Sequence, residues 1–86
     1  MISSRISVTT TATLLVAATE NATRTIWLEA VGNDINLGGS NVTASTGLTL
    51  KNGTQTYLVL PPLNSLYAIT NAGTHQCIIL QPSGDY

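Results

Sequence analysis

The sequence predicts an all-β fold, a small antiparallel β-sandwich or barrel of about eight short strands. Three observations predict it. Short β-branched or aromatic runs recur about every ten residues, and Gly, Asn, Asp or Pro bound them. No window repeats apolar residues at helical spacing over three turns, and the many threonines disfavour a helix. The 86 residues suffice for one domain and are too few for two.

Four strand-forming runs lie in the first half of the chain. They are residues 6–10, 13–17, 25–30 and 35–37. In the third run, Ile26 and Leu28 fall on one face of a strand, and Trp27 and Glu29 fall on the other. Residues 32–34 (GND) have the composition of a turn and separate the third run from the fourth.

Four more runs lie in the second half. They are residues 48–50, 55–60, 66–70 and 75–80. Asn52-Gly53 predicts a hairpin between the first two, because both central positions of its turn accept positive φ. Pro61-Pro62 ends the second run, since proline cannot continue a strand ladder. Residues 71–74 predict the turn of a closing hairpin between the last two runs.

Apolar residues that alternate along these runs predict the core. They are Leu14, Val16, Ile26, Leu28, Ile35, Leu37, Leu48, Leu50, Leu58, Leu60, Leu66, Ala68, Ile78 and Leu80. The alternation is imperfect in residues 57–60 and 77–80, where both faces are apolar. A strand of this kind is central in a larger stack or packed against another subunit. We therefore expect contact with another chain.

The charge content is low. Only 8% of residues are charged, against about 25% in a typical globular domain. Arg5, Arg24 and Lys51 are the formal cations, and three scattered cations do not form the basic stripe that nucleic-acid binding needs. Hydrophobic residues make up 43% of the chain, so we expect another chain to bury some apolar area. Cys77 is the one cysteine, which excludes an intrachain disulfide and favours a reducing compartment or stabilisation by assembly.

The N-terminal segment has an early arginine and an apolar stretch, as a secretion signal has. Its longest unbroken apolar run, residues 14–18, is shorter than the usual ~7–15 residues. No segment approaches the ~20 apolar residues of a membrane span. We expect residues 1–86 to form one β domain without membrane contact, in which residues 1–11 and 83–86 act as contact arms.

The residues that carry catalysis or bind metals are few. His75 is the one histidine, and no Gly-x-Ser-x-Gly motif accompanies it. His75 and Cys77 share a strand face, but they supply two of the four ligands of a structural zinc site, so we interpret them as a half-exposed histidine beside a buried thiol. The carboxylates are scattered, and Asp34 alone makes a weak calcium site. We expect no catalytic residue, metal or cofactor, and no enzyme.

Residues 37–50 (LGGSNVTASTGLTL) contain features of a ligand loop. Their glycines match neither phosphate-binding pattern, and no helix follows them. Asn21, Asn41 and Asn52 begin glycosylation motifs, which chance produces readily in a chain rich in Asn and Thr. We expect Gly38-Gly39 to end a strand where side chains are excluded, and residues 40–46 to cross the edge of the sandwich.

A longer pattern extends over residues 24–80. Its parts are RTIWL at 24–28, INLGGS at 35–40, VT at 42–43, GLTL at 47–50, Gly53, LYAI at 66–69 and AGT at 72–74. This pattern resembles a recurrent small β module of tailed-bacteriophage virions. The sequence departs from the pattern at Glu29, where asparagine is common, and at Pro61-Pro62.

The resemblance implies a capsid decoration (cement) or head-fibre type protein. Such a protein is assembled in the host cytoplasm, binds the major capsid protein at the capsid surface and is often a homotrimer. Our candidate subunit or capsid contacts are Ile2, Arg5, Trp27, Tyr57, Val59, Tyr67, Ile79 and Tyr86. One alternative is a phage tail or fibre module that binds host-surface glycans, which requires an exposed aromatic or carboxylate cluster near Trp27 or residues 37–47. Another alternative is a fragment of a secreted bacterial adhesin.

Overall fold

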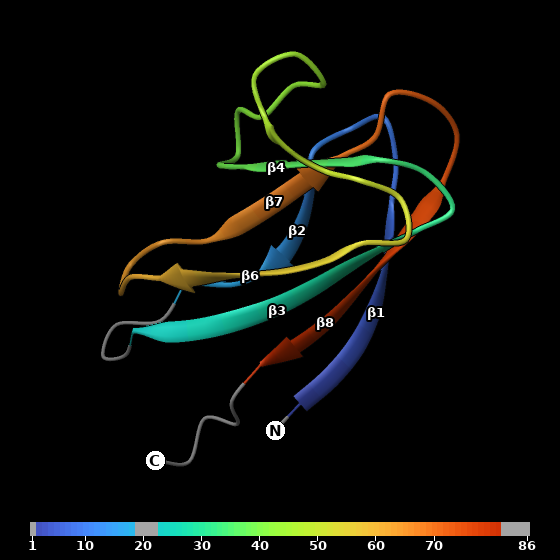
Figure 1. Cartoon of the computed structure of the whole chain (residues 1–86). Coiled ribbons are helices and arrows are strands. Elements are labelled where there is room, and N and C mark those ends of the chain that lie inside the picture. Colours follow the sequence, from blue (N-terminus) through green and yellow to red (C-terminus); the bar gives the residue numbers. More distant parts are fainter. Residues whose placement is uncertain (1, 19–22, 82–86) are drawn as a thin grey trace.

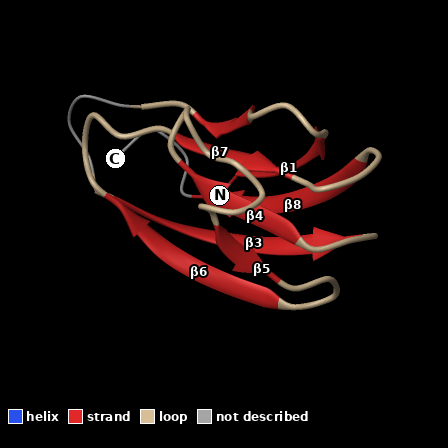
Figure 2. Ribbon diagram, turned by 90° about the horizontal axis from the view of Figure 1, so that it is seen from above, coloured by secondary structure: helices blue, strands red, loops and turns tan. Residues whose placement is uncertain are grey.

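The computed structural model describes residues 2–18 and 23–81, and within them the fold is all-β (Figures 1 and 2). The strands are β1 (Ile2–Val8), β2 (Thr13–Val16), β3 (Arg24–Val31), β4 (Ile35–Gly38), β5 (Leu48–Leu50), β6 (Gln55–Leu60), β7 (Leu66–Ile69) and β8 (His75–Gln81). Each run expected from the sequence overlaps one of these strands. The small antiparallel β-sandwich expected from the sequence is therefore confirmed.

The strands form two four-stranded sheets. The first sheet has the order β1-β8-β3-β6, and the second sheet has the order β2-β7-β4-β5. All neighbouring strands are antiparallel. Each strand of the first half of the chain pairs with a strand of the second half, the first with the last and so on inward: β1 with β8, β2 with β7, β3 with β6 and β4 with β5. A chain folded back on itself in this way and wound into two sheets is a jelly roll.

The sequence predicted hairpins between β5 and β6 and between β7 and β8, and both predictions are wrong. Gly53 adopts the expected positive φ of 78°, but β5 lies in the second sheet and β6 in the first. Residues 71–74 likewise connect β7 of the second sheet to β8 of the first. Turn chemistry sets the local backbone conformation, whereas pairing with distant strands decides which sheet each strand joins. The Gly53 N–H accordingly donates to the Ala30 carbonyl of β3, at 2.9 Å.

The core lies between the sheets, and most of the expected residues are in it. Its largest fully buried side chains are Ile26, Leu28, Ile35, Ile79, Val8, Thr70 and Cys77. Leu58 is half-buried and packs against this core. Two expected core residues are exposed. Leu14 lies at a register shift after which Leu15 and Val16 both turn inward, and Leu48 begins the three-residue edge strand β5.

The expected orientation of β8 is also wrong. Cys77 and Ile79 are fully buried, whereas Ile78 and Leu80 are half-exposed. The pairing with β3 explains this, because Ile79 lies opposite Leu28, which points inward. Since β8 is apolar on both faces, alternation alone could not distinguish the two orientations. Ile79 is thus a core residue, and its side chain is not available for subunit or capsid contact.

The N-terminal segment does not form a free arm. Residues 2–8 are β1, which pairs with β8 from Ile2↔Gln81 to Val8↔His75. Val8 is fully buried, so this segment is an integral edge strand of the first sheet. The second expected arm, residues 83–86, lies outside the described residues.

Residues 39–47 join β4 to β5 and fold back over β4. Val42 is buried there, and a Cβ at Gly38 would lie 2.9 Å from its Cγ2 atom. A Cβ at Gly47 would lie 2.7 Å from the Cβ of Asn36. Glycine is therefore needed at both positions because a neighbouring side chain occupies the space, and neither has positive φ. This agrees with the expectation that side chains are excluded at Gly38.

Candidate interaction surface

The outer face of the first sheet carries exposed apolar side chains. On β3 the inward residues are Ile26, Leu28 and Ala30, so Trp27 points outward. Trp27 lies opposite Tyr57 of β6 and opposite Leu80 of β8, so these three form one row across the sheet. The rings of Trp27 and Tyr57 have centroids 6.4 Å apart and planes inclined at 38°.

Burial values show how open this row is. Trp27 is 44% exposed, Tyr57 64% and Val59 57%. On β8, Leu80 of this row and Ile78 on the same face are half-exposed. We call Trp27, Tyr57, Val59, Ile78 and Leu80 the apolar surface. Contiguous exposed apolar area of this kind on a small domain is typical of an interaction site.

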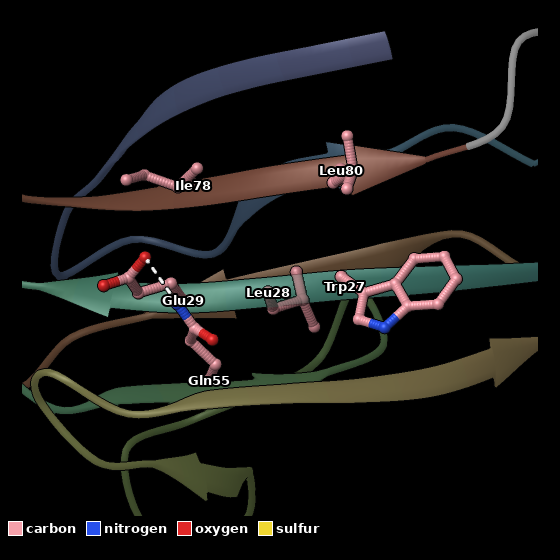
Figure 3. A pocket seen from close by; sticks show the side chains of 6 residues that line it. All are labelled: Trp27, Leu28, Glu29, Gln55, Ile78 and Leu80. Atoms are coloured by element: carbon pink, nitrogen blue, oxygen red, sulfur yellow. Dashed lines mark hydrogen bonds between the residues drawn. The ribbon is translucent and has the colours of Figure 1, made fainter. Parts of the chain in front are cut away.

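A groove of about 410 Å³ runs along the apolar surface (Figure 3). It is lined by Trp27, Leu28, Glu29, Gln55, Ile78 and Leu80. The Nε2–H of Gln55 donates to Oε1 of Glu29, at 3.4 Å, on the side of the groove away from Trp27 (Figure 3). The groove is therefore mainly apolar, with one hydrogen-bonded polar pair.

Two formal charges of opposite sign lie on this face of the described sheet. Arg5 of β1 and Glu29 of β3 both lie opposite Ile78, on either side of β8. The Nη1–H of Arg5 donates to Oε1 of Gln76, at 2.7 Å. In the described residues neither charge forms a salt bridge. The face is thus nearly neutral, and its interactions are mainly those of apolar side chains.

A polar network joins the loops at one end of the sandwich. Asp34 accepts hydrogen bonds from the Asn52 backbone N–H at 2.8 Å and from Nζ of Lys51 at 3.5 Å. The Asn52 bond is the main cause that lowers the pKa of Asp34, and Lys51 adds to it. Buried Thr70 donates to the Asp34 carbonyl, and Asn33 donates to Thr70. The Asp34 carboxylate therefore joins the turn after β3 to the connection between β5 and β6.

His75 and Cys77 also have structural surroundings. The Nε2–H of His75 donates to the Ala72 carbonyl at 3.0 Å, and its ring packs on Gly32, where a Cβ would lie 2.8 Å from Nδ1. Cys77 is fully buried, and burial raises the pKa of its thiol to about 11. Within residues 2–18 and 23–81, no group of three or more His, Cys, Asp or Glu gathers in a metal-binding arrangement.

Arg24 is a buried charge that the sequence did not reveal. It is 6% exposed at the start of β3, and its Nη2–H donates to the Ala17 carbonyl at 3.0 Å. Its Nε has no hydrogen-bond partner among the described residues. The bond to Ala17 ties the start of β3 to the backbone just after β2.

The candidate contact residues have different positions. Arg5, Trp27, Tyr57 and Val59 share the outer face of the first sheet. Tyr67 is half-buried on the second sheet, opposite Leu14 and Gly38. Ile2 is described only by its backbone pairing in β1, and Tyr86 lies outside the described residues. Ile78 and Leu80 belong to the apolar surface but were expected in the core, because their orientation depends on the pairing of β8 with β3.

Comparison of the chain with protein-family models, curated proteins and solved structures finds no match. None of the described residues belongs to a helix long and apolar enough to cross a membrane. The apolar surface and the sequence pattern of residues 24–80 are therefore the features that bear on function.

Proposed function

We propose that this chain is a non-enzymatic structural protein of a tailed-bacteriophage virion, which decorates and stabilises the capsid as a homotrimer. The apolar surface of the first sheet is the observation that supports this proposal. Trp27, Tyr57 and Val59 are 44%, 64% and 57% exposed, which favours a surface covered by another chain. The resemblance of residues 24–80 to virion modules indicates the kind of assembly.

The mechanism is adhesion. Each apolar side chain removed from water contributes about 25 cal/mol per Å² of buried area, and aromatic residues bury the most. A trimer attached to adjacent copies of the major capsid protein binds at several points at once, which multiplies a modest affinity. Such a clamp holds capsid subunits together against internal pressure without a chemical step, a metal or a cofactor.

Cryo-electron microscopy of the virion tests the proposal. We expect β-sandwich density on the outside of the capsid, in contact with the major capsid protein. Co-sedimentation with capsids that lack the protein is the corresponding binding test. Tyr57→Ala should weaken binding at least tenfold, because it removes apolar area that joins the copies of the trimer and so reduces the number of attachment points. Leu48→Ala, which truncates an exposed apolar residue of the second sheet, should not. Virions without this protein on their capsids would contradict the proposal.

A second candidate function is a tail or fibre module that binds host-surface glycans. The groove favours it, because it is lined by the aromatic ring of Trp27 and, on its other side, by the hydrogen-bonding groups of Glu29 and Gln55. Tyr57 adds a second ring next to Trp27. Aromatic rings stack on the apolar faces of sugars, and carboxylate and amide groups bind hydroxyls. Glycan-array binding that Trp27→Ala abolishes would favour this candidate over capsid decoration.

A further inference from the structure

The first sheet has two free edges. In the described residues β6 pairs only with β3, and β1 pairs only with β8. The outward side of each edge strand therefore presents backbone N–H and C=O groups without a strand partner. Such an edge accepts another strand unless the sequence protects it.

The edges of the two sheets differ in how well they are protected. In the second sheet, β5 has three residues, and β2 has four and contains a register shift. Short or irregular edges resist pairing. In the first sheet, β1 has seven residues and β6 has six, and both keep regular register with their neighbours. β6 contains no charged residue and no proline, and Pro61 comes directly after its last residue. The first sheet alone presents two long, regular free edges.

The directions of these edges are compatible with each other. Each neighbour in the order β1-β8-β3-β6 is antiparallel, so β1 and β6 run in opposite directions. Rotation about an axis parallel to the strands leaves strand direction unchanged. If copies are arranged around such an axis, β6 of one copy meets β1 of the next as an antiparallel pair. A ring of copies can thus close with the antiparallel pattern unbroken.

We propose that copies of this chain join head to tail, β6 of one copy to β1 of the next, and close a threefold ring with the apolar surfaces facing the axis. This inference rests on the homotrimer of the proposed function. Closure removes every free edge of the three first sheets, as in a closed barrel. It also buries the exposed Trp27 and Tyr57, so one arrangement provides partners for the backbone edges and covers the apolar side chains.

Side-chain sizes at the two edges agree with this pairing. On the outer face of β1, Ser3 and Ser7 flank Arg5, and all three are exposed. On the same face of β6 lie the larger Tyr57 and Val59. Small residues on one strand leave room for the larger side chains of the strand paired with it. An arginine beside a tyrosine ring adds a cation–π contact.

Light scattering after size-exclusion chromatography tests the inference with matched variants. Val59→Lys places a charge on the β6 edge and Ser3→Lys on the β1 edge, while Leu48→Lys makes the matched change on β5 of the second sheet. All three positions are exposed in a single chain, so each variant should keep the wild-type circular dichroism spectrum. We expect three times 9.0 kDa for the wild type and Leu48→Lys, and 9.0 kDa for both Val59→Lys and Ser3→Lys.

Other outcomes overturn the inference in distinct ways. A monomeric wild type removes the trimer itself. A trimer that survives either edge variant rejects the edge pairing while leaving capsid decoration intact. If the wild type has a mass of twice 9.0 kDa and only Val59→Lys dissociates it, the copies pair through β6 of each chain in a twofold dimer instead. If a variant fails to fold, hydrogen exchange on the wild type decides, because β1 and β6 amides must gain protection with concentration and β5 amides must not.

Discussion

The outer faces of the two sheets differ in what covers them. Over the second sheet, residues 39–47 fold back so that Val42 and Asn36 are only 6% and 7% exposed. Thr49 donates a hydrogen bond to the Asn36 side chain at 2.9 Å, which provides that buried amide with a partner. Over the first sheet no described segment lies across Trp27 and Tyr57, which remain 44% and 64% exposed.

This difference shows that the fold can cover a sheet with its own loop. The cover over the second sheet requires only a short loop with one apolar residue, Val42, and glycines at 38 and 47 that make room for it. The first sheet has larger apolar side chains and no such cover. Large exposed apolar areas are typical of interaction sites, which is why we propose that another chain covers this face. The following predictions test this contrast.

The largest effect is expected at β8, where inner and outer faces carry the same residue type. Ile79→Ala should lower the free energy of unfolding by about 2–5 kcal/mol, because it opens a cavity in the core. Ile78→Ala, on the half-exposed outer face, should cost less than about 1.5 kcal/mol in the monomer. Urea denaturation of both variants measures the difference. Equal losses would mean that the orientation of β8 is wrong.

The cover over the second sheet should fail when its glycines are replaced. Gly47→Ala should cost about 1–3 kcal/mol, because the new Cβ would lie 2.7 Å from the Cβ of Asn36 and 2.8 Å from Cγ2 of Val42. Gly39→Ala is the matched control, since its Cβ would have no neighbour nearer than 3.5 Å and its φ is not positive. Thermal denaturation compares the two variants. A neutral Gly47→Ala would show that residues 39–47 do not pack on β4.

A smaller effect is expected from pH, through Cys77. Burial raises the pKa of its thiol to about 11, above its ordinary value of 9.0, so the folded state favours the protonated form. Its contribution to stability is complete below about pH 9 and is lost as pH rises toward about 11. The urea midpoint of the wild type should therefore fall more over this range than that of Cys77→Ala, which has no thiol. The same fall in both proteins would assign the effect to other groups.

Local sequence patterns predicted the strands but not their partners. The composition of runs such as residues 55–60 is sufficient to predict a strand. Alternation correctly placed Trp27 on the outer face of its strand and Ile26 and Leu28 on the core face. Alternation could not orient β8, because Cys77-Ile78-Ile79-Leu80 is apolar on both faces. The Asn52-Gly53 turn gave the correct φ and the wrong partner, since a jelly roll pairs strands that are distant in the chain.

Prediction of the candidate interaction surface from the sequence had the same limit: it depended on knowing the orientation of each strand. Trp27, Tyr57, Val59 and Arg5, which the sequence suggested as contact residues, share the outer face of the first sheet. Ile78 and Leu80 were missed and Ile79 was wrongly included for one reason, the orientation of β8. Val42 was missed because a loop has no periodic pattern from which burial can be inferred.

The fluorescence of Trp27 tests most directly whether another chain covers the first sheet. The chain has one tryptophan, so emission reports on this surface alone. Acrylamide quenching and emission wavelength should be measured over a dilution series whose assembly state is followed by sedimentation. The expected result is efficient quenching of the dilute monomer, where Trp27 is 44% exposed, and a blue shift with several-fold weaker quenching once it assembles. Assembly that leaves both the emission and the quenching unchanged would contradict this account.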